Sequence, residues 1–218
     1  MATSDELRSR LVERLVAGGT IVTANVRRAL AAVPRERFVP EVDLTEAYAD
    51  APVALKRGRT GRMLSTVSQP TMVATMLEML RVEAGQRVLE IGTGSGYNAA
   101  LLAELVGPKG SVVSVEVEAD LTERASAALA ATGYAERVQT HTADGAAGWS
   151  ADAPYDRIIA TVGVGEIPRP WVDQLRVGGW LVAPVVDGKG RGTTVAYQRR
   201  PDGIQPHEQV PCGFLVMR

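Results

Sequence analysis

The sequence contains very little cysteine and histidine. Cys212 is the single cysteine, which excludes a disulfide bond within the chain, and His141 and His207 are too few and too far apart to suggest a zinc site. No apolar run approaches the roughly 20 residues that a membrane-spanning helix needs. We therefore expect a protein without a metal centre, without a disulfide framework and without a membrane partner.

A strong net charge is also missing. The chain has 24 Lys and Arg residues against 25 Asp and Glu residues, for a net charge of -1, so no broad nucleic-acid footprint is expected. The first ten residues are polar and do not resemble a signal peptide, which favours a cytoplasmic location. A length of 218 residues suits one α/β domain. We expect the protein to act as a monomer.

A strand, a glycine-rich loop and a helix follow one another at the centre of the sequence. Val88, Leu89 and Ile91 form a short apolar run that predicts a buried strand. Three glycines come next in the spacing G-x-G-x-G, at positions 92, 94 and 96, and residues 97–105 carry an apolar helical face. Glycine is needed in such a loop where the turn is tight and a ligand approaches bare backbone.

Acidic residues are predicted at the ends of three neighbouring strands. Glu90 precedes the glycine loop, Glu116 ends the next predicted strand, and Asp144 follows the third. An acid after the second strand can accept hydrogen bonds from a ribose diol, and Asp144 with Gly145 suits an adenine edge. Glu90 would repel a phosphate and attract a cation, which favours S-adenosylmethionine over a dinucleotide. Taken singly, the loop and the Asp144 turn also fit ordinary connections.

Strands and helices alternate along most of the chain. This order predicts a doubly wound, mostly parallel Rossmann-like sheet, with helices over residues 5–17 and from about residue 23 as an N-terminal cover. The C-terminal end is expected to be antiparallel, with a last strand over residues 210–217. We divide the single domain of residues 1–218 into N-terminal helices and a substrate or cofactor loop (1–68), a Rossmann-like core (69–186) and C-terminal strands (187–218).

A long irregular connection is expected over residues 34–68. It contains a basic cluster that ends just before the segment Ser65–Pro70, namely Lys56, Arg57, Arg59 and Arg62. Connections of this length in compact domains are usually functional or mobile. One interpretation is a solvated basic loop; the other is a loop that attracts an anionic substrate through Arg57, Arg59 and Arg62.

Several segments together resemble the protein-L-isoaspartate O-methyltransferases, a family of class I methyltransferases. The segments VPRERFVP, AYADAPVAL, VSQP, VLEIGTGSGYNAALLAEL, TADGAAGW, APYDRIIAT and EIPRPWVDQLRVGGWLVAPV occur in the family order. The resemblance covers roughly residues 10–186. It implies S-adenosylmethionine-dependent methylation of an isoaspartyl carboxylate in a protein or peptide, with S-adenosylhomocysteine as the product.

The resemblance also implies the site residues. Thr66, Val67 and Ser68 match a segment that lines both the cofactor and the substrate pockets, and Ser68 matches the active-site serine. The cofactor contacts implied are Ser65, Thr66, Val67, Ser68, Glu90, Gly92, Thr93, Gly94, Glu116, Asp144 and Gly145. Taken alone, Ser68 also fits a helix N-cap before the helix predicted at Thr71.

Two segments depart from the family pattern. They are ALKRGRTGRMLS, before the TVS segment, and VDGKGRGTTVAYQRR, after the APV segment. One alternative is therefore methylation of a specific aspartate in a precursor peptide of a natural-product pathway, which leads to aspartimide formation. Alternatives of other classes are a non-catalytic cofactor-binding or scaffold module and a dinucleotide-dependent oxidoreductase, which the glycine spacing disfavours.

Overall fold

The computed structural model describes residues 2–218. The N-terminal part contains α1 (Ser4–Ala17), α2 (Ala24–Ala32), η1 (Arg35–Arg37), α3 (Leu44–Ala47), β1 (Val53–Arg57), β2 (Met63–Val67) and α4 (Pro70–Leu80). The central part contains β3 (Arg87–Ile91), α5 (Tyr97–Val106), β4 (Ser111–Glu116), α6 (Ala119–Ala131), β5 (Val138–Thr142), η2 (Gly145–Ala147) and η3 (Ser150–Asp152). The last part contains β6 (Tyr155–Ala160), α7 (Arg169–Gln174), β7 (Leu175–Val186), β8 (Arg191–Arg200) and β9 (Gly203–Gly213).

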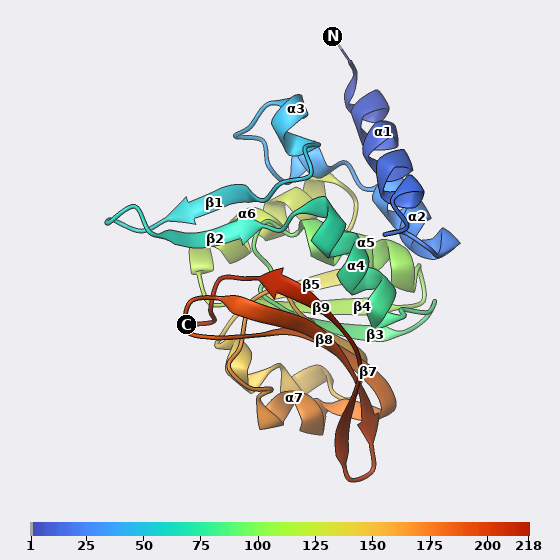
Figure 1. The fold of residues 1–218 in the computed structure, drawn as a ribbon, viewed down its shortest axis with the longest axis vertical. Helices are drawn as coiled ribbons and strands as arrows, with labels where there is room; N and C mark the ends of the chain where they lie inside the picture. Colours follow the sequence, from blue (N-terminus) through green and yellow to red (C-terminus); the bar gives the residue numbers. More distant parts are fainter. Residues whose placement is uncertain (1) are drawn as a thin grey trace.

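The main sheet has the strand order β5-β4-β3-β6-β7-β8-β9 (Figure 1). The first five of these strands pair in parallel, and β8 and β9 pair antiparallel at one edge. The predicted doubly wound sheet with an antiparallel C-terminal end is therefore confirmed. Because the order reverses between β3 and β6, their carboxyl ends flank the point at which ligands bind in folds of this kind.

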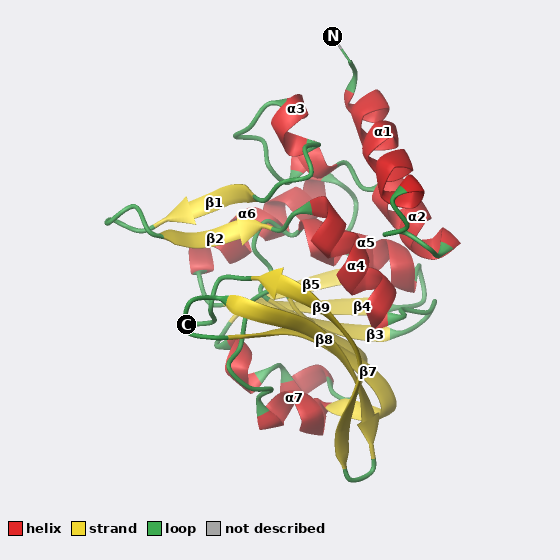
Figure 2. Cartoon of the chain, in the orientation of Figure 1, coloured by secondary structure: helices red, strands yellow, loops and turns green. Residues whose placement is uncertain are grey.

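Helices cover both faces of this sheet (Figure 2). One face packs on the core that includes residues of α1, α2, α4 and α5, while α7 covers the other face, with Trp171 completely buried. Branched apolar residues fill both faces of the central strands, as expected for parallel strands between two helical layers. In the described chain, no helix is long and apolar enough to cross a membrane.

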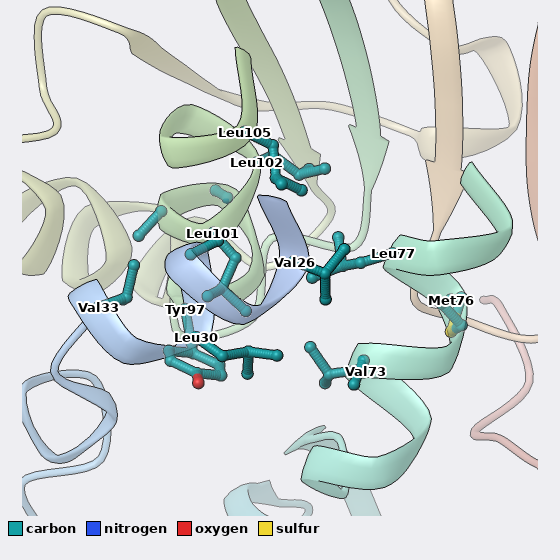
Figure 3. Close-up of a cluster of buried hydrophobic side chains, with 14 of the residues drawn as sticks. Val26, Leu30, Val33, Val73, Met76, Leu77, Tyr97, Leu101, Leu102 and Leu105 are labelled. Carbon is teal, nitrogen blue, oxygen red and sulfur yellow. The ribbon is translucent and has the colours of Figure 1, made fainter. Parts of the chain in front are cut away.

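Helices α2, α4 and α5 share one tightly packed core. Figure 3 shows Val26 and Leu30 of α2, Val73 and Leu77 of α4, and Leu101 of α5 pointing toward one another. All five side chains are buried, and each contributes about 1.5–3 kcal/mol through removal from water. This packing fixes α4, which follows Ser68, and α5, which follows the glycine loop.

The expectation of an irregular connection over residues 34–68 is wrong. The segment contains η1, α3 and the antiparallel hairpin β1–β2, whose turn is closed by hydrogen bonds from Gly58 N to Arg62 O (2.8 Å) and from Gly61 N to Gly58 O (2.9 Å). Gly61 has φ of 79°, a conformation that favours glycine. The sequence concealed the strands because only one residue of each, Val53 and Val67, is buried in the core, so a regular apolar alternation is missing.

The last strand also differs from its expected position. It runs over Gly203–Gly213 rather than over residues 210–217, and it pairs with β8 along its whole length. It lies at the edge of the sheet and is largely polar, with Pro206 and Pro211 in its sequence. Prolines and polar residues are tolerated at an edge, so composition does not reveal this strand. After Gly213 the chain runs beside Gly163, where Val216 forms an isolated parallel bridge.

Candidate active site

A cavity of about 490 Å³ lies at the carboxyl edge of the parallel strands. Its volume is in the range of small-molecule sites. The predicted site residues that line it are Ser65, Thr66, Ser68, Gly92, Gly94, Glu116 and Gly145. It is also lined by Thr161 and Val162 after β6, by residues 189–191 between β7 and β8, and by residues 213–218. The site thus joins segments from most of the chain, from Pro52 to Arg218.

The glycine loop presents bare backbone to this cavity. Gly92, Gly94 and Gly96 have φ values of 97°, 54° and 85°, which side-chain-bearing residues rarely adopt. A Cβ atom on Gly92 would lie 2.7 Å from Oγ1 of Thr161. The same Thr161 hydroxyl donates to the carbonyl oxygen of Gly92 at 2.6 Å. Thr161, which the sequence interpretation missed, therefore holds the loop against the next strand.

Glu116 is fixed by backbone donors at one end of the cavity. Its Oε2 accepts a hydrogen bond from Gly94 N at 2.9 Å, and its Oε1 accepts from Val117 N at 3.0 Å and from Glu118 N at 3.3 Å. The Gly94 amide is consequently occupied by a carboxylate and is not free for a phosphate. This arrangement suits a nucleoside with free hydroxyl groups better than a pyrophosphate.

Glu90 and Thr93 lie beneath the glycine loop and do not line the large cavity. Glu90 is completely buried and accepts hydrogen bonds from Nδ2 of Asn98 at 2.8 Å and from the Ser114 hydroxyl. Burial raises the pKa of Glu90 to about 7, although these two hydrogen bonds oppose the shift. Thr93 is 2.7 Å from the Ser114 hydroxyl. These buried hydrogen bonds support the glycine loop. The sequence patterns did not predict that Asn98 and Ser114 take part in them.

Asp144 shapes the turn after β5. Its Oδ1 accepts a hydrogen bond from Ala146 N at 2.9 Å, while Gly145 itself lines the cavity. A Cβ atom at Gly145 would lie 2.5 Å from Cγ2 of Ile91, and the carbonyl oxygen of Gly145 accepts from Trp171 Nε1 at 2.8 Å. The backbone at this position is thus held close to β3 and α7.

The segment Ser65–Ser68 forms another part of the cavity wall, beside Gly94. Ser65, Thr66 and Ser68 line the cavity, whereas Val67 is buried and packs into the core. The carbonyl oxygen of Ser68 accepts a hydrogen bond from Nη2 of Arg35 at 3.0 Å. Arg35 is completely buried, and its guanidinium lies 4.8 Å from the centre of the Tyr97 ring. Arg35 therefore fixes the backbone that carries Ser68.

The interpretation of Ser68 as a helix cap is wrong. Helix α4 has Gln69 at its N-cap position without a side-chain cap bond. The cap comes instead from Asp50, whose Oδ1 accepts from Thr71 N at 2.8 Å and whose Oδ2 accepts from Thr71 Oγ1 at 2.6 Å. Asp50 lies 21 residues before Thr71, so local spacing did not reveal it. The Ser68 side chain is not needed for capping.

The basic residues of the hairpin lie outside the cavity. Arg57, Arg59 and Arg62 do not line it, and the amino group of Lys56 is paired with Glu118 at 2.5 Å and with Asp120 at 2.6 Å. The hairpin projects toward the side of the molecule on which the C-terminus lies (Figure 1). The cationic residues that do line the cavity are Lys189, Arg191 and Arg218, none of which the sequence interpretation selected.

A family model and a similar protein of known name both point to the same family. A family model for protein-L-isoaspartate(D-aspartate) O-methyltransferase matches residues 6–216. A protein-L-isoaspartate O-methyltransferase from Hyperthermus butylicus is 41% identical over 219 residues, which cover 97% of this chain and 88% of that protein.

Solved structures agree with this family. A protein-L-isoaspartate O-methyltransferase superposes with a TM-score of 0.88 at 32% identity, covering 97% of this chain and 66% of that chain. A beta-aspartate methyltransferase from Plasmodium falciparum, solved with S-adenosyl-L-homocysteine, has a TM-score of 0.79 at 21% identity and shows the same fold. The matched model spans nearly the whole chain, and this chain therefore belongs to the protein-L-isoaspartate(D-aspartate) O-methyltransferase family.

Proposed function

We propose that the chain transfers a methyl group from S-adenosylmethionine to the free carboxylate of an isoaspartyl residue in a protein or peptide. The observation that carries the proposal is the cavity that joins Glu116 and the glycine loop to Ser68, in a chain of this family. The aligned methyltransferases favour this function over the three alternatives raised from the sequence. Methylation leads to repair because a backbone amide nitrogen attacks the ester and expels methanol, which gives a succinimide that water reopens partly as normal aspartate.

The lining of the cavity fits the cofactor. The oriented carboxylate of Glu116 would accept hydrogen bonds from the ribose hydroxyl groups, and the turn at Asp144 and Gly145 would meet the adenine edge. Ile91, Val115 and Val162 provide apolar walls for the flat ring. When bound, S-adenosylmethionine supplies a methyl group that its sulfonium makes electrophilic. Three predicted cofactor residues lie behind these walls, namely Glu90, Thr93 and Val67. We propose that they act on the cofactor indirectly, by supporting the glycine loop and strand β2.

The protein must mainly align the two reactants. The free carboxyl of an isoaspartyl residue is its α-carboxyl, with an ordinary pKa of about 3.3–3.7, so the acceptor is ionised at neutral pH and needs no general base. Holding it in line with the methyl group lowers the barrier by several kcal/mol, in the manner of an intramolecular reaction. We assign to Ser68 a hydrogen bond to this carboxylate and to Arg35 the positioning of Ser68.

The hairpin cations have a different proposed role. Arg57, Arg59 and Arg62 form no ion pair with a carboxylate in the described part of the chain, and they lie outside the cavity. We propose that they attract the anionic substrate from a distance, an effect that salt screens. We also propose that residues 1–218 work as one domain and as a monomer, in the cytoplasm, where the methyl donor is made.

Incubation of a synthetic isoaspartyl peptide with the protein and S-adenosylmethionine tests this function. We expect a base-labile methyl ester, followed by the succinimide and then by a growing fraction of the normal aspartyl peptide. A Glu116→Ala variant at the same concentration serves as a control for contaminating methyltransferases. Absence of the ester with the folded wild-type protein, or a methyl group that resists base, would contradict the proposal.

A further inference from the structure

The cavity carries an excess of positive charge at the turn between β7 and β8. The charged residues of its lining are Lys189, Arg191 and Arg218 against one carboxylate, that of Glu116. Arg218 is neutralised in part by Glu118, which lies 2.9 Å away. Lys189 has no carboxylate within ion-pair distance in the described part of the chain, and Arg191 has only a long contact of 3.8 Å to Asp187. Lys189 and Arg191 are therefore available to a ligand.

The turn that carries these two cations is held in one conformation. Oδ1 of Asp187 accepts from Lys189 N at 2.8 Å and from Arg191 N at 3.0 Å. The carbonyl oxygen of Gly190 accepts from Phe214 N at 2.9 Å, and a Cβ atom at Gly190 would lie 2.2 Å from the Phe214 carbonyl oxygen. The turn is thus docked on the C-terminal segment, and a docked turn loses less entropy when it binds a ligand.

The position of the turn separates it from the nucleoside end of the cavity. Glu116 ends β4, whereas Lys189 follows β7, and β3 and β6 lie between these two strands. Three strand spacings correspond to about 14 Å. By strand order, the two cations belong to the β7–β8 end of the cavity and not to the Glu116 end that is assigned to the ribose.

These cations are poorly suited to the carboxylate that reacts. Methyl transfer removes the negative charge of that carboxylate, so a strong ion pair would stabilise the reactant more than the transition state and would slow the reaction. A carboxylate that keeps its charge throughout the reaction carries no such penalty. An arginine fork and a lysine ammonium both suit a side-chain carboxylate of a peptide.

We propose that Lys189 and Arg191 bind a second, non-reacting carboxylate of the substrate, so that the enzyme prefers isoaspartyl peptides with an acidic residue beside the isoaspartyl residue. This inference rests on the proposed function, because it names the class of peptide that the same site accepts. The preference differs from the distant attraction assigned to the hairpin, since it depends on the position of the acidic residue in the peptide.

The test uses isoaspartyl peptides that differ only by Glu or Gln at one flanking position, with the flank varied on each side. The variants are Lys189→Ala with Arg191→Ala, and a control that removes the same charge elsewhere, Lys109→Ala with Arg27→Ala. Lys109 lies in a glycine-containing turn just before β4, at the amino end of that strand, and both control side chains are exposed. KM for each peptide and the cofactor Kd are measured at low salt.

For one of the two flanking positions, we expect the wild-type protein and the control variant to have a KM for the Glu peptide about 3- to 10-fold lower than for the Gln peptide. This is the effect of one or two exposed ion pairs. The double variant is expected to lose this difference while its cofactor Kd stays the same. A Lys189→Glu, Arg191→Glu variant should instead prefer a Lys-flanked peptide, which a merely misfolded protein cannot do.

Equal KM values for both peptides with the wild-type protein would overturn the proposal, as would a preference that survives in the double variant. A weakened cofactor Kd in the double variant would assign the two cations to the carboxylate of S-adenosylmethionine and would also overturn it. These failures are distinct from failure of the proposed function, in which no peptide is methylated and both proposals fall.

Discussion

Arg35 donates a hydrogen bond from Nη2 to the carbonyl oxygen of Ser68 at 3.0 Å, while its Nε donates to the carbonyl oxygen of Ala47 at 2.9 Å. The side chain is completely buried. One guanidinium thus ties the wall of the cavity that carries Ser68 to the end of α3. A lysine at this position has a single point charge and cannot match the fork of an arginine.

We therefore predict that Arg35→Lys lowers kcat for an isoaspartyl peptide at least tenfold and leaves the cofactor Kd within about twofold, on the scale of one lost charged hydrogen bond. Steady-state kinetics are measured well below the unfolding temperature, with calorimetry for the cofactor. A variant with a lower Tm but an unchanged kcat would show that Arg35 stabilises the fold without positioning Ser68.

Replacement of Glu116 is expected to affect the cofactor selectively. Its carboxylate is already oriented by three backbone amides, and loss of charged-acceptor hydrogen bonds to a ribose costs about 1–3 kcal/mol. We predict that Glu116→Gln raises the Kd for S-adenosylhomocysteine about 5- to 150-fold. Glu123→Gln, at an exposed site of α6 outside the cavity lining, is the control in the same titration. Equal effects of the two substitutions would remove the ribose assignment.

Glu90 makes the stability of the protein depend on pH. Its pKa is about 7 in the folded protein, against an ordinary value of 4.5. The folded state therefore keeps a proton that the unfolded chain releases, so this group makes the protein progressively less stable as the pH rises from about 4.5 to about 7. The loss of unfolding free energy over this pH range is roughly 3 kcal/mol.

We predict that Glu90→Gln reduces the loss of unfolding free energy between about pH 5 and about pH 8, because the amide does not ionise. Denaturant unfolding at both pH values measures the difference. Glu13→Gln, at an exposed site, should leave it as in the wild-type protein. An unchanged pH dependence in the Glu90 variant would mean that the folded protein holds this carboxyl ionised.

Asp50 is expected to stabilise α4 at its N-terminus. Burial raises the pKa of Asp50, but hydrogen bonds from Thr71 and Gln69 outweigh this effect and hold it below its ordinary value. The stabilisation is thus fully present above the unfolded pKa of about 3.8 and is lost as the pH falls through the lower folded pKa. Asp50→Ala should cost about 1 kcal/mol at neutral pH. Asp202→Ala, at an exposed acid in the β8–β9 turn, should cost nothing measurable by thermal unfolding.

The central unit of the fold could be predicted because its signals are local. The apolar run of β3, the three glycines and the acid at the end of β4 all lie within 30 residues and obey simple periodicities. The parallel sheet and the predicted residues along the cavity wall follow from this unit. The helix cap from Asp50 and the support from Arg35 were missed because their partners are distant in sequence, and backbone carbonyl oxygens carry no sequence signal.

The remaining differences have physical causes of the same kind. Hairpin β1–β2 mixes apolar and basic residues without a regular alternation, and the edge strand β9 is mostly polar, whereas strand prediction depends on apolar periodicity. Lys189 and Arg191 were overlooked in favour of the denser cluster at Arg57, Arg59 and Arg62. Only the strand order brings the β7–β8 turn to the cavity, and this order follows from the packing of the whole chain.

The most direct test of the central claim is a competition between two peptides. An isoaspartyl peptide and its normal aspartyl twin, identical in sequence and present at equal concentration, are incubated with S-adenosylmethionine, and methyl esters on each are quantified by mass spectrometry. The account predicts esters on the isoaspartyl peptide and none above background on its twin, together with loss of the signal in Ser68→Ala. Equal or preferential methylation of the aspartyl twin would contradict it.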